Sequence, residues 1–214
     1  KVKKPIYSQL WGYIIKQKIQ NQEKVIERAT KDEFTIRNLI TLEHEVKSSD
    51  KTNREGIAAK SFFDGLYGRV FVRRQSAQDE INSALNYGYT ILAANMSRIL
   101  AMYGFNTILG IHHRSMTNNF NLSYDLIEPF RASVDYFVYN HLDDLAYPLP
   151  KDIRLGLVKL LQEPVRINNR IYRIENAMEE MVLSLIQVLE NEDSRMLVLP
   201  FVIEPESIED EVEL

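Results

Sequence analysis

The fold is decided by the stretch that contains the longest uncharged run of the chain, Glu80-Ile-Asn-Ser-Ala-Leu-Asn-Tyr-Gly-Tyr-Thr-Ile-Leu-Ala-Ala-Asn-Met-Ser-Arg-Ile-Leu-Ala-Met-Tyr103. It carries no charge from Ile81 to Ser97, and its pattern predicts one long helix with Asp79 as its N-cap. A membrane span needs about 20 mainly apolar residues, and asparagine, serine and tyrosine side chains interrupt this stretch. We therefore expect a helix in the core of a helical domain.

Amphipathic segments on both sides extend this prediction. An entry helix is indicated by apolar residues spaced four apart: Tyr7, Trp11, Ile15 and Ile19. We expect three lysines on its more hydrated side: Lys16, Lys18 and Lys24. Further helices are predicted near residues 34–42, 53–66 with Asn53 as cap, 122–137, 151–162 and 174–189. Alternation around Asn168-Asn169 predicts a small β-hairpin over residues 165–174.

The composition agrees with a mainly α fold. The 214 residues include only 8 glycines and 7 prolines, so turns are few. We expect one helical domain over residues 1–203, followed by an acidic tail at 204–214. The absence of cysteine excludes disulfides, Cys-ligated zinc and thiol catalysis, and it agrees with a cytoplasmic protein. The chain starts at Lys1 with no apolar signal segment, which suggests a piece of a longer protein.

Charge is distributed unevenly along the chain. The formal net charge is −4, yet residues 1–74 hold 16 Lys and Arg against 9 Asp and Glu. Residues 204–214 hold six acids and no base. A basic first third is compatible with a phosphate-facing surface, but charge alone favours a hydrated helical surface.

The chemically unusual stretch is Gly110-Ile-His-His-Arg-Ser-Met-Thr-Asn-Asn-Phe-Asn-Leu-Ser-Tyr-Asp-Leu-Ile-Glu-Pro-Phe-Arg131. Asp125 and Glu128 are three residues apart and therefore neighbours on one helical face, and Arg131 is placed to pair with Glu128. Carboxylates with a single imidazole suit magnesium or manganese. His113 and Glu128 are candidates for such a site, with Glu55 as the best remote acid because small residues flank it.

Each of these residues also has a structural explanation. Glu55 would complement its helix dipole, and Asp125 and Glu128 would form a hydrated pair. His112 and His113 would be hydrogen-bonded loop residues.

Three motifs in this order resemble a known family. They are Asn53-Arg-Glu-Gly-Ile-Ala-Ala59, Ile81-Asn-Ser-Ala-Leu-Asn-Tyr-Gly-Tyr-Thr-Ile-Leu92 and the His-His-Arg-Ser…Asp-Leu-Ile-Glu-Pro-Phe-Arg stretch. Together with the opening Leu10-Trp-Gly-Tyr-Ile-Ile they resemble the CRISPR-associated integrases of spacer acquisition, the Cas-one family, from Lys1 to about Leu161. The paired histidines and Asn-Asn-Phe-Asn-Leu look most like members from type II loci.

The resemblance implies a metal-dependent DNA endonuclease and integrase. It implies that Glu55, His113 and Glu128 are catalytic and bind Mg²⁺ or Mn²⁺, with Asp125 and Arg131 as supporting groups. The implied reaction inserts a captured DNA fragment into the CRISPR repeat by attack of a 3′-hydroxyl on a phosphodiester. Our candidates for contacts to the DNA phosphates are Lys60, Arg69, Arg73, Arg74 and Arg114.

The resemblance also implies partners. These are double-stranded DNA, a second small CRISPR adaptation protein and, through an amino-terminal β-sandwich absent before Lys1, a second copy in the full-length protein. No membrane is expected. The alternative function is a non-catalytic helical adaptor that binds DNA or protein, and metal chelation distinguishes the two because only catalysis requires the metal.

Overall fold

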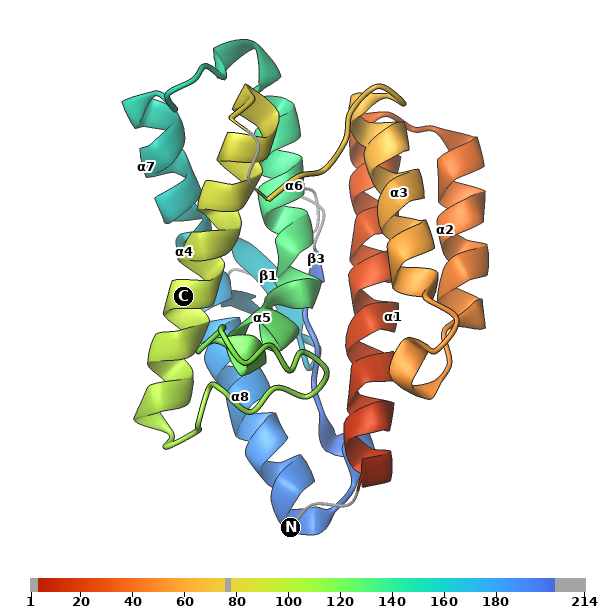
Figure 1. Cartoon of the computed structure of the whole chain (residues 1–214), viewed down its shortest axis with the longest axis vertical. Coiled ribbons are helices and arrows are strands. Elements are labelled where there is room, and N and C mark those ends of the chain that lie inside the picture. The colour runs from red at the N-terminus through yellow and green to blue at the C-terminus, as the bar shows by residue number, and fades with distance from the viewer. Residues whose placement is uncertain (1–3, 76–77, 203–214) are drawn as a thin grey trace.

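The computed structural model describes residues 4–75 and 78–202, and it is mainly α-helical as predicted (Figure 1). The predicted acidic tail lies outside these residues. The described α-helices are α1 (Lys4–Ala29), α2 (Glu33–Glu45), α3 (Arg54–Tyr67), α4 (Glu80–Met102), α5 (Asn121–Ile127), α6 (Arg131–Asn140), α7 (Lys151–Lys159) and α8 (Ile174–Asn191). Short 3₁₀ turns are η1 (Ser48–Asp50), η2 (Glu128–Phe130), η3 (Leu142–Asp144), η4 (Leu160–Gln162) and η5 (Ser194–Met196).

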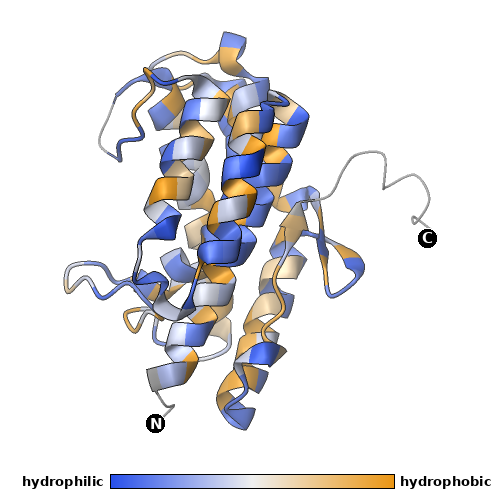
Figure 2. Ribbon diagram, turned by 90° about the vertical axis from the view of Figure 1, so that its right-hand side faces the viewer, coloured by the Kyte–Doolittle hydropathy of each residue, from blue (hydrophilic) through white to orange (hydrophobic). Residues whose placement is uncertain are grey.

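The helices form two groups. Helices α1, α2 and α3 pack together on one side, and α4 to α8 form the other (Figure 1). Helix α1 lies between them, because it contacts α2 and α3 on one face and η2 and α6 on the other. Apolar residues concentrate on the inward faces (Figure 2). Trp11, Phe62 and Phe130 are among the largest fully buried side chains.

The central position of α1 corrects one prediction. Lys18 was expected on the hydrated side of the helix, but it is only 7% exposed. Polar neighbours on the same face are also buried, including Asn21 and Gln22. The amide nitrogen Nδ2 of Asn21 donates to the carbonyl oxygens of Pro129 at 2.7 Å and of Pro200 at 2.9 Å. The second face of α1 is therefore a polar interface, and the helix has no broad hydrated side.

The predicted hairpin is present. Strands β1 (Pro164–Ile167) and β2 (Arg170–Arg173) pair antiparallel, and Ile167 faces Arg170 across a two-residue turn. Both turn residues, Asn168 and Asn169, have positive φ angles of 50° and 60°, as a type I′ turn requires. A third strand, β3 (Phe201–Val202), was not predicted and pairs with the other edge of β1.

The segment predicted as one helix over residues 122–137 is interrupted. Helix α5 ends at Ile127, η2 follows, and α6 starts at Arg131. Pro129 explains the interruption, because it lacks the backbone N–H that an α-helix needs at that position. Among the described residues, no helix is long and apolar enough to cross a membrane.

Candidate active site

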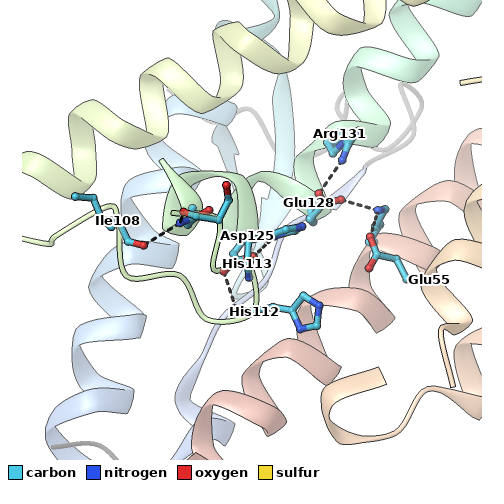
Figure 3. A network of polar contacts seen from close by, with 10 residues as sticks. Glu55, Ile108, His112, His113, Asp125, Glu128 and Arg131 are labelled. Atoms are coloured by element: carbon cyan, nitrogen blue, oxygen red, sulfur yellow. Dashed lines mark hydrogen bonds and ion pairs between the residues drawn. The ribbon is translucent and has the colours of Figure 1, made fainter. Parts of the chain in front are cut away.

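Two acidic residues from opposite sides of the fold meet at one lysine (Figure 3). Glu55 lies in the first turn of α3, and Glu128 is the first residue of η2. The ammonium nitrogen Nζ of Lys18 is 2.7 Å from Oε1 of Glu55 and 2.6 Å from Oε2 of Glu128. The Glu128 side chain is 3% exposed, and that of Lys18 is 8% exposed. The two predicted acids thus converge on one cation, which in the described structure is a lysine.

Glu55 is positioned by the cap of α3. The backbone N–H groups of Arg54 and Glu55 both donate to the carboxylate of Asp50, each at 2.9 Å. Asn53 was predicted as this cap, but its side chain makes no capping hydrogen bond, and its φ of 53° is left-handed. Asp50 therefore satisfies the free N–H groups at the helix start and fixes the backbone of Glu55.

Glu128 is held between two positive charges. Besides Lys18, the guanidinium nitrogen Nη1 of Arg131 lies 2.7 Å from Oε1 of Glu128, which is the ion pair that the three-residue spacing predicts. Burial alone would raise the pKa of Glu128, but the charges of Arg131 and Lys18 outweigh it and lower that pKa to about 2. Glu128 is therefore a carboxylate at any physiological pH.

His113 is oriented by Asp125. Its ring nitrogen Nδ1 lies 2.5 Å from Oδ1 of Asp125, which is fully buried. The same carboxylate accepts the backbone N–H groups of His112 at 2.8 Å and His113 at 3.3 Å. The hydrogen bond to Asp125 raises the pKa of His113, and the charges of Glu128 and Glu55 add to this effect. Nδ1 is thus engaged, which leaves Nε2 as the ring nitrogen for a ligand.

The loop around Asp125 requires a glycine. A Cβ atom on Gly110 would lie 2.3 Å from the carbonyl oxygen of His113 and 2.8 Å from Oδ2 of Asp125. His112 takes a different direction from His113 (Figure 3). Its ring stacks on Trp11 with a centroid distance of 4.2 Å and lines a separate cavity of about 340 Å³.

His113 and Glu128 line a common cavity of about 390 Å³. Arg73 lines it as well, donating at 2.9 Å to Asn82 and at 2.6 Å to Asn86. The other DNA-binding candidates are dispersed: Lys60 on α3 pairs with Asp64, Arg69 and Arg74 are exposed in the segment after α3, and Arg114 lines the cavity beside His112. Of the five, Arg73 is thus the one placed at the cavity that His113 and Glu128 share.

The donor set fits a divalent metal in its chemistry. Two carboxylates and one imidazole suit a manganese- or magnesium-like ion, and both carboxylates already contact one cation. The side chains of Glu55, Glu128 and His113 are not close enough together to bind one metal ion as they stand, however. Within residues 4–75 and 78–202, no three His, Cys, Asp or Glu side chains stand close enough to hold a metal ion.

Among the residues of this site, Lys18 is one whose burial was not predicted. A signal was available, because Lys18 follows Ile14 by four residues and Trp11 by seven, which places it on the apolar face of the helix. A lysine on such a face is buried only with a charged partner, and the two glutamates are that partner.

Comparisons with known proteins identify the family of the chain. The profile of the family "CRISPR associated protein Cas1" matches residues 7–147. A CRISPR-associated endonuclease Cas1 of Neisseria meningitidis serogroup C (strain 8013) is 35% identical over 201 residues, which cover 93% of this chain and 65% of that protein.

Solved structures share the fold. A chain of a partial Cas6-RT-Cas1–Cas2 complex aligns with a TM-score of 0.76 at 20% identity, covering 94% of this chain and 70% of that one. A casposase bound to integration product aligns with a TM-score of 0.68 at 20% identity, covering 87% and 65%. The family profile spans more than half of the chain, and this chain belongs to the Cas1 family of CRISPR-associated proteins.

Proposed function

We propose that this chain is the catalytic domain of a metal-dependent DNA endonuclease and integrase of CRISPR adaptation. The observation that carries the proposal is the meeting of Glu55 and Glu128 at one cation, beside a histidine that Asp125 orients. Glu55 comes from α3, whereas His113, Asp125 and Glu128 come from the loop before α5, from α5 and from η2. An adaptor that only binds DNA has no need of a buried carboxylate at Glu128 paired through Lys18 with a second acid.

The residues divide the work of the reaction. Glu55, Glu128 and Nε2 of His113 are the proposed metal ligands, and a bound divalent cation would lower the pKa of the attacking hydroxyl and polarise the phosphoryl oxygen. Asp125 fixes the ring of His113, so that Nε2 faces outward from the hydrogen-bonded side. Arg131 fixes one oxygen of Glu128. In the proposed transfer, the 3′-hydroxyl oxygen bonds to phosphorus while the bridging P–O bond of the repeat breaks.

The DNA contacts are also part of the proposal. Arg73 is the leading candidate because it lines the cavity shared by His113 and Glu128, and it lies 5.2 Å from the ring centre of Tyr89. Lys60, Arg69, Arg74 and Arg114 would contact phosphates farther from the centre.

The partners follow from relatives. A structural neighbour was solved in a complex that includes Cas2, and we propose a comparable small partner here. We further propose double-stranded DNA as substrate, a homodimer in the full-length protein and a cytoplasmic location.

A pair of adjacent histidines provides the test. His113→Ala should abolish strand transfer in the presence of Mn²⁺ and leave DNA binding largely intact, since His113 is 48% exposed and adds little to the core. His112→Ala is the matched control and should retain activity, because that ring stacks on Trp11 instead. The variants are compared for strand transfer, for DNA binding and for melting temperature.

Two results would refute the proposal. One is wild-type strand transfer by His113→Ala. The other is wild-type strand transfer that persists when a chelator removes all divalent metal.

A further inference from the structure

Both oxygens of Glu128 are already in contact with positive charges. Oε1 accepts from Arg131, and Oε2 lies 2.6 Å from the ammonium of Lys18. Glu128 is buried, so neither contact is exchanged freely with water. If Glu128 binds a divalent cation, as the proposed function requires, it must use an oxygen that one of these residues now contacts.

Lys18 is the group that has to move. It also contacts Oε1 of Glu55, so its ammonium takes the position between the two proposed ligands. An ammonium and a divalent cation repel each other and cannot use the same carboxylate oxygens at contact distance. Arg131 contacts only Glu128 among these acids, and it leaves Oε2 free.

A second position for the ammonium exists nearby. A cavity of about 160 Å³ is lined by Lys18, Gln22 and Asp135, and also by Arg73 and Arg131. Oε1 of Gln22 is buried and has no hydrogen-bond partner within the described part of the chain. Gln22 follows Lys18 by one helical turn, so the two side chains are neighbours on α1. A lysine side chain that rotates along the helix therefore finds an unused acceptor, with the buried carboxylate of Asp135 in the same cavity.

We propose that Lys18 is a positioning residue with two places: between Glu55 and Glu128 before the metal binds, and beside Gln22 and Asp135 afterwards. In the first place it holds together two carboxylates that would otherwise repel each other across the interface of α1, α3 and η2. In the second place it leaves Oε1 of Glu55 and Oε2 of Glu128 free to bind the metal. This inference rests on the proposed function.

A competing cation and a merely structural lysine predict opposite results. Lys18→Met keeps the length of the side chain and removes its charge. Suppose that Lys18 competes with the metal and that the two carboxylates are free of its ammonium in about 10% of the molecules. Removal of the ammonium should then tighten Mn²⁺ binding about tenfold, because all of the molecules can bind the metal. The metal-free melting temperature should fall, and Mn²⁺ should restore more of it than in the wild type. A structural lysine that helps to shape the metal site would instead weaken Mn²⁺ binding when it is removed.

Gln22→Leu tests the second place and serves also if Lys18→Met does not fold. It removes the unused acceptor, so the metal-free melting temperature should not fall, whereas Mn²⁺ affinity should weaken. Lys24→Met is the matched control, because Lys24 lies on the same helix and pairs with Glu27 at 2.7 Å on a more exposed surface. It should leave Mn²⁺ affinity unchanged.

Mn²⁺ affinity is measured by calorimetric titration of the metal-free protein without DNA. Unchanged or weaker binding in Lys18→Met overturns the inference, as does unchanged binding in Gln22→Leu. Glu55→Gln separates this failure from that of the proposed function. Wild-type protein that binds no Mn²⁺, or binds it as well after Glu55→Gln, refutes the metal site itself.

Discussion

Glu128→Gln is the sharpest test of the charge arrangement around η2. The substitution keeps the shape of the side chain and removes its negative charge. Lys18 then keeps only Glu55 as an ion-pair partner, and Arg131 loses its ion pair with Glu128. Breaking a buried ion pair in this way is strongly destabilising, because the remaining charges have been removed from water.

The magnitude follows from the pKa of Glu128. The pKa falls from 4.5 to about 2 on folding, because the charges of Arg131 and Lys18 outweigh burial. A difference of that size corresponds to about 3 kcal/mol in the free energy of unfolding. Since the folded-state pKa is the lower one, this stabilisation is complete above pH 4.5 and is lost as the pH falls toward 2. For a protein of this length, about 3 kcal/mol corresponds to about 6–12 °C in melting temperature.

Urea unfolding of the wild type and Glu128→Gln at pH 7 and pH 3 measures this contribution. The difference between them should be about 3 kcal/mol at pH 7. It should shrink by more than half at pH 3, because Glu128 is then protonated in the unfolded chain, and unfolding gains the free energy of taking up that proton. Glu33→Gln is the control, since Glu33 pairs with Arg37 at 2.6 Å but both side chains are exposed, where ion pairs contribute little. Equal stability of Glu128→Gln and wild type at pH 7 would refute the reasoning.

Two further predictions concern other buried positions. Burial raises the pKa of Asp135 from 3.8 to about 6, so the free energy of unfolding should decline by about 3 kcal/mol as the pH rises from 4 through 6. Asp135→Asn should lack this decline when urea unfolding is compared at pH 4 and pH 8. An equal decline in the wild type and the variant would contradict the prediction. Gly110→Ala should reduce the free energy of unfolding by about 1–3 kcal/mol and lower the melting temperature, because the added Cβ would meet the carbonyl oxygen of His113. An unchanged melting temperature would contradict this prediction and show that the loop adjusts freely.

Much of the fold was predictable because it depends on local signals. The N-cap of α4 at Asp79 and the Asn168-Asn169 turn are determined by residues adjacent to the elements that they bound. The cap of α3 was mispredicted as Asn53. The capping side chain is that of Asp50, three residues before Asn53, and it reaches the helix start through a turn with positive φ angles. Strand β3 was missed, since two residues have no periodicity of their own and pair only with a distant strand.

In the candidate site, too, local contacts were predictable from spacing and contacts between distant segments were not. The pairing of Glu128 with Arg131 follows from helical spacing, and it is present. The meeting of Glu55 with Glu128 was expected from the small residues that flank Glu55 and from the family resemblance, since no spacing rule relates residues on different helices. Lys18 was misplaced because its charge was taken to indicate the hydrated side of the helix, whereas its spacing from Trp11 and Ile14 places it on the covered, apolar face.

The amide of Asn21 links the order of synthesis to the completion of the fold. Its two carbonyl partners lie 108 and 179 residues further along the chain. During synthesis α1 emerges first, yet it cannot make both of these bonds until Pro200 has left the ribosome. Contacts across such separations slow folding, because a long loop must close before they form. Helix α1 is therefore made early relative to its partners, and its packing is complete only after residue 200 has been synthesised.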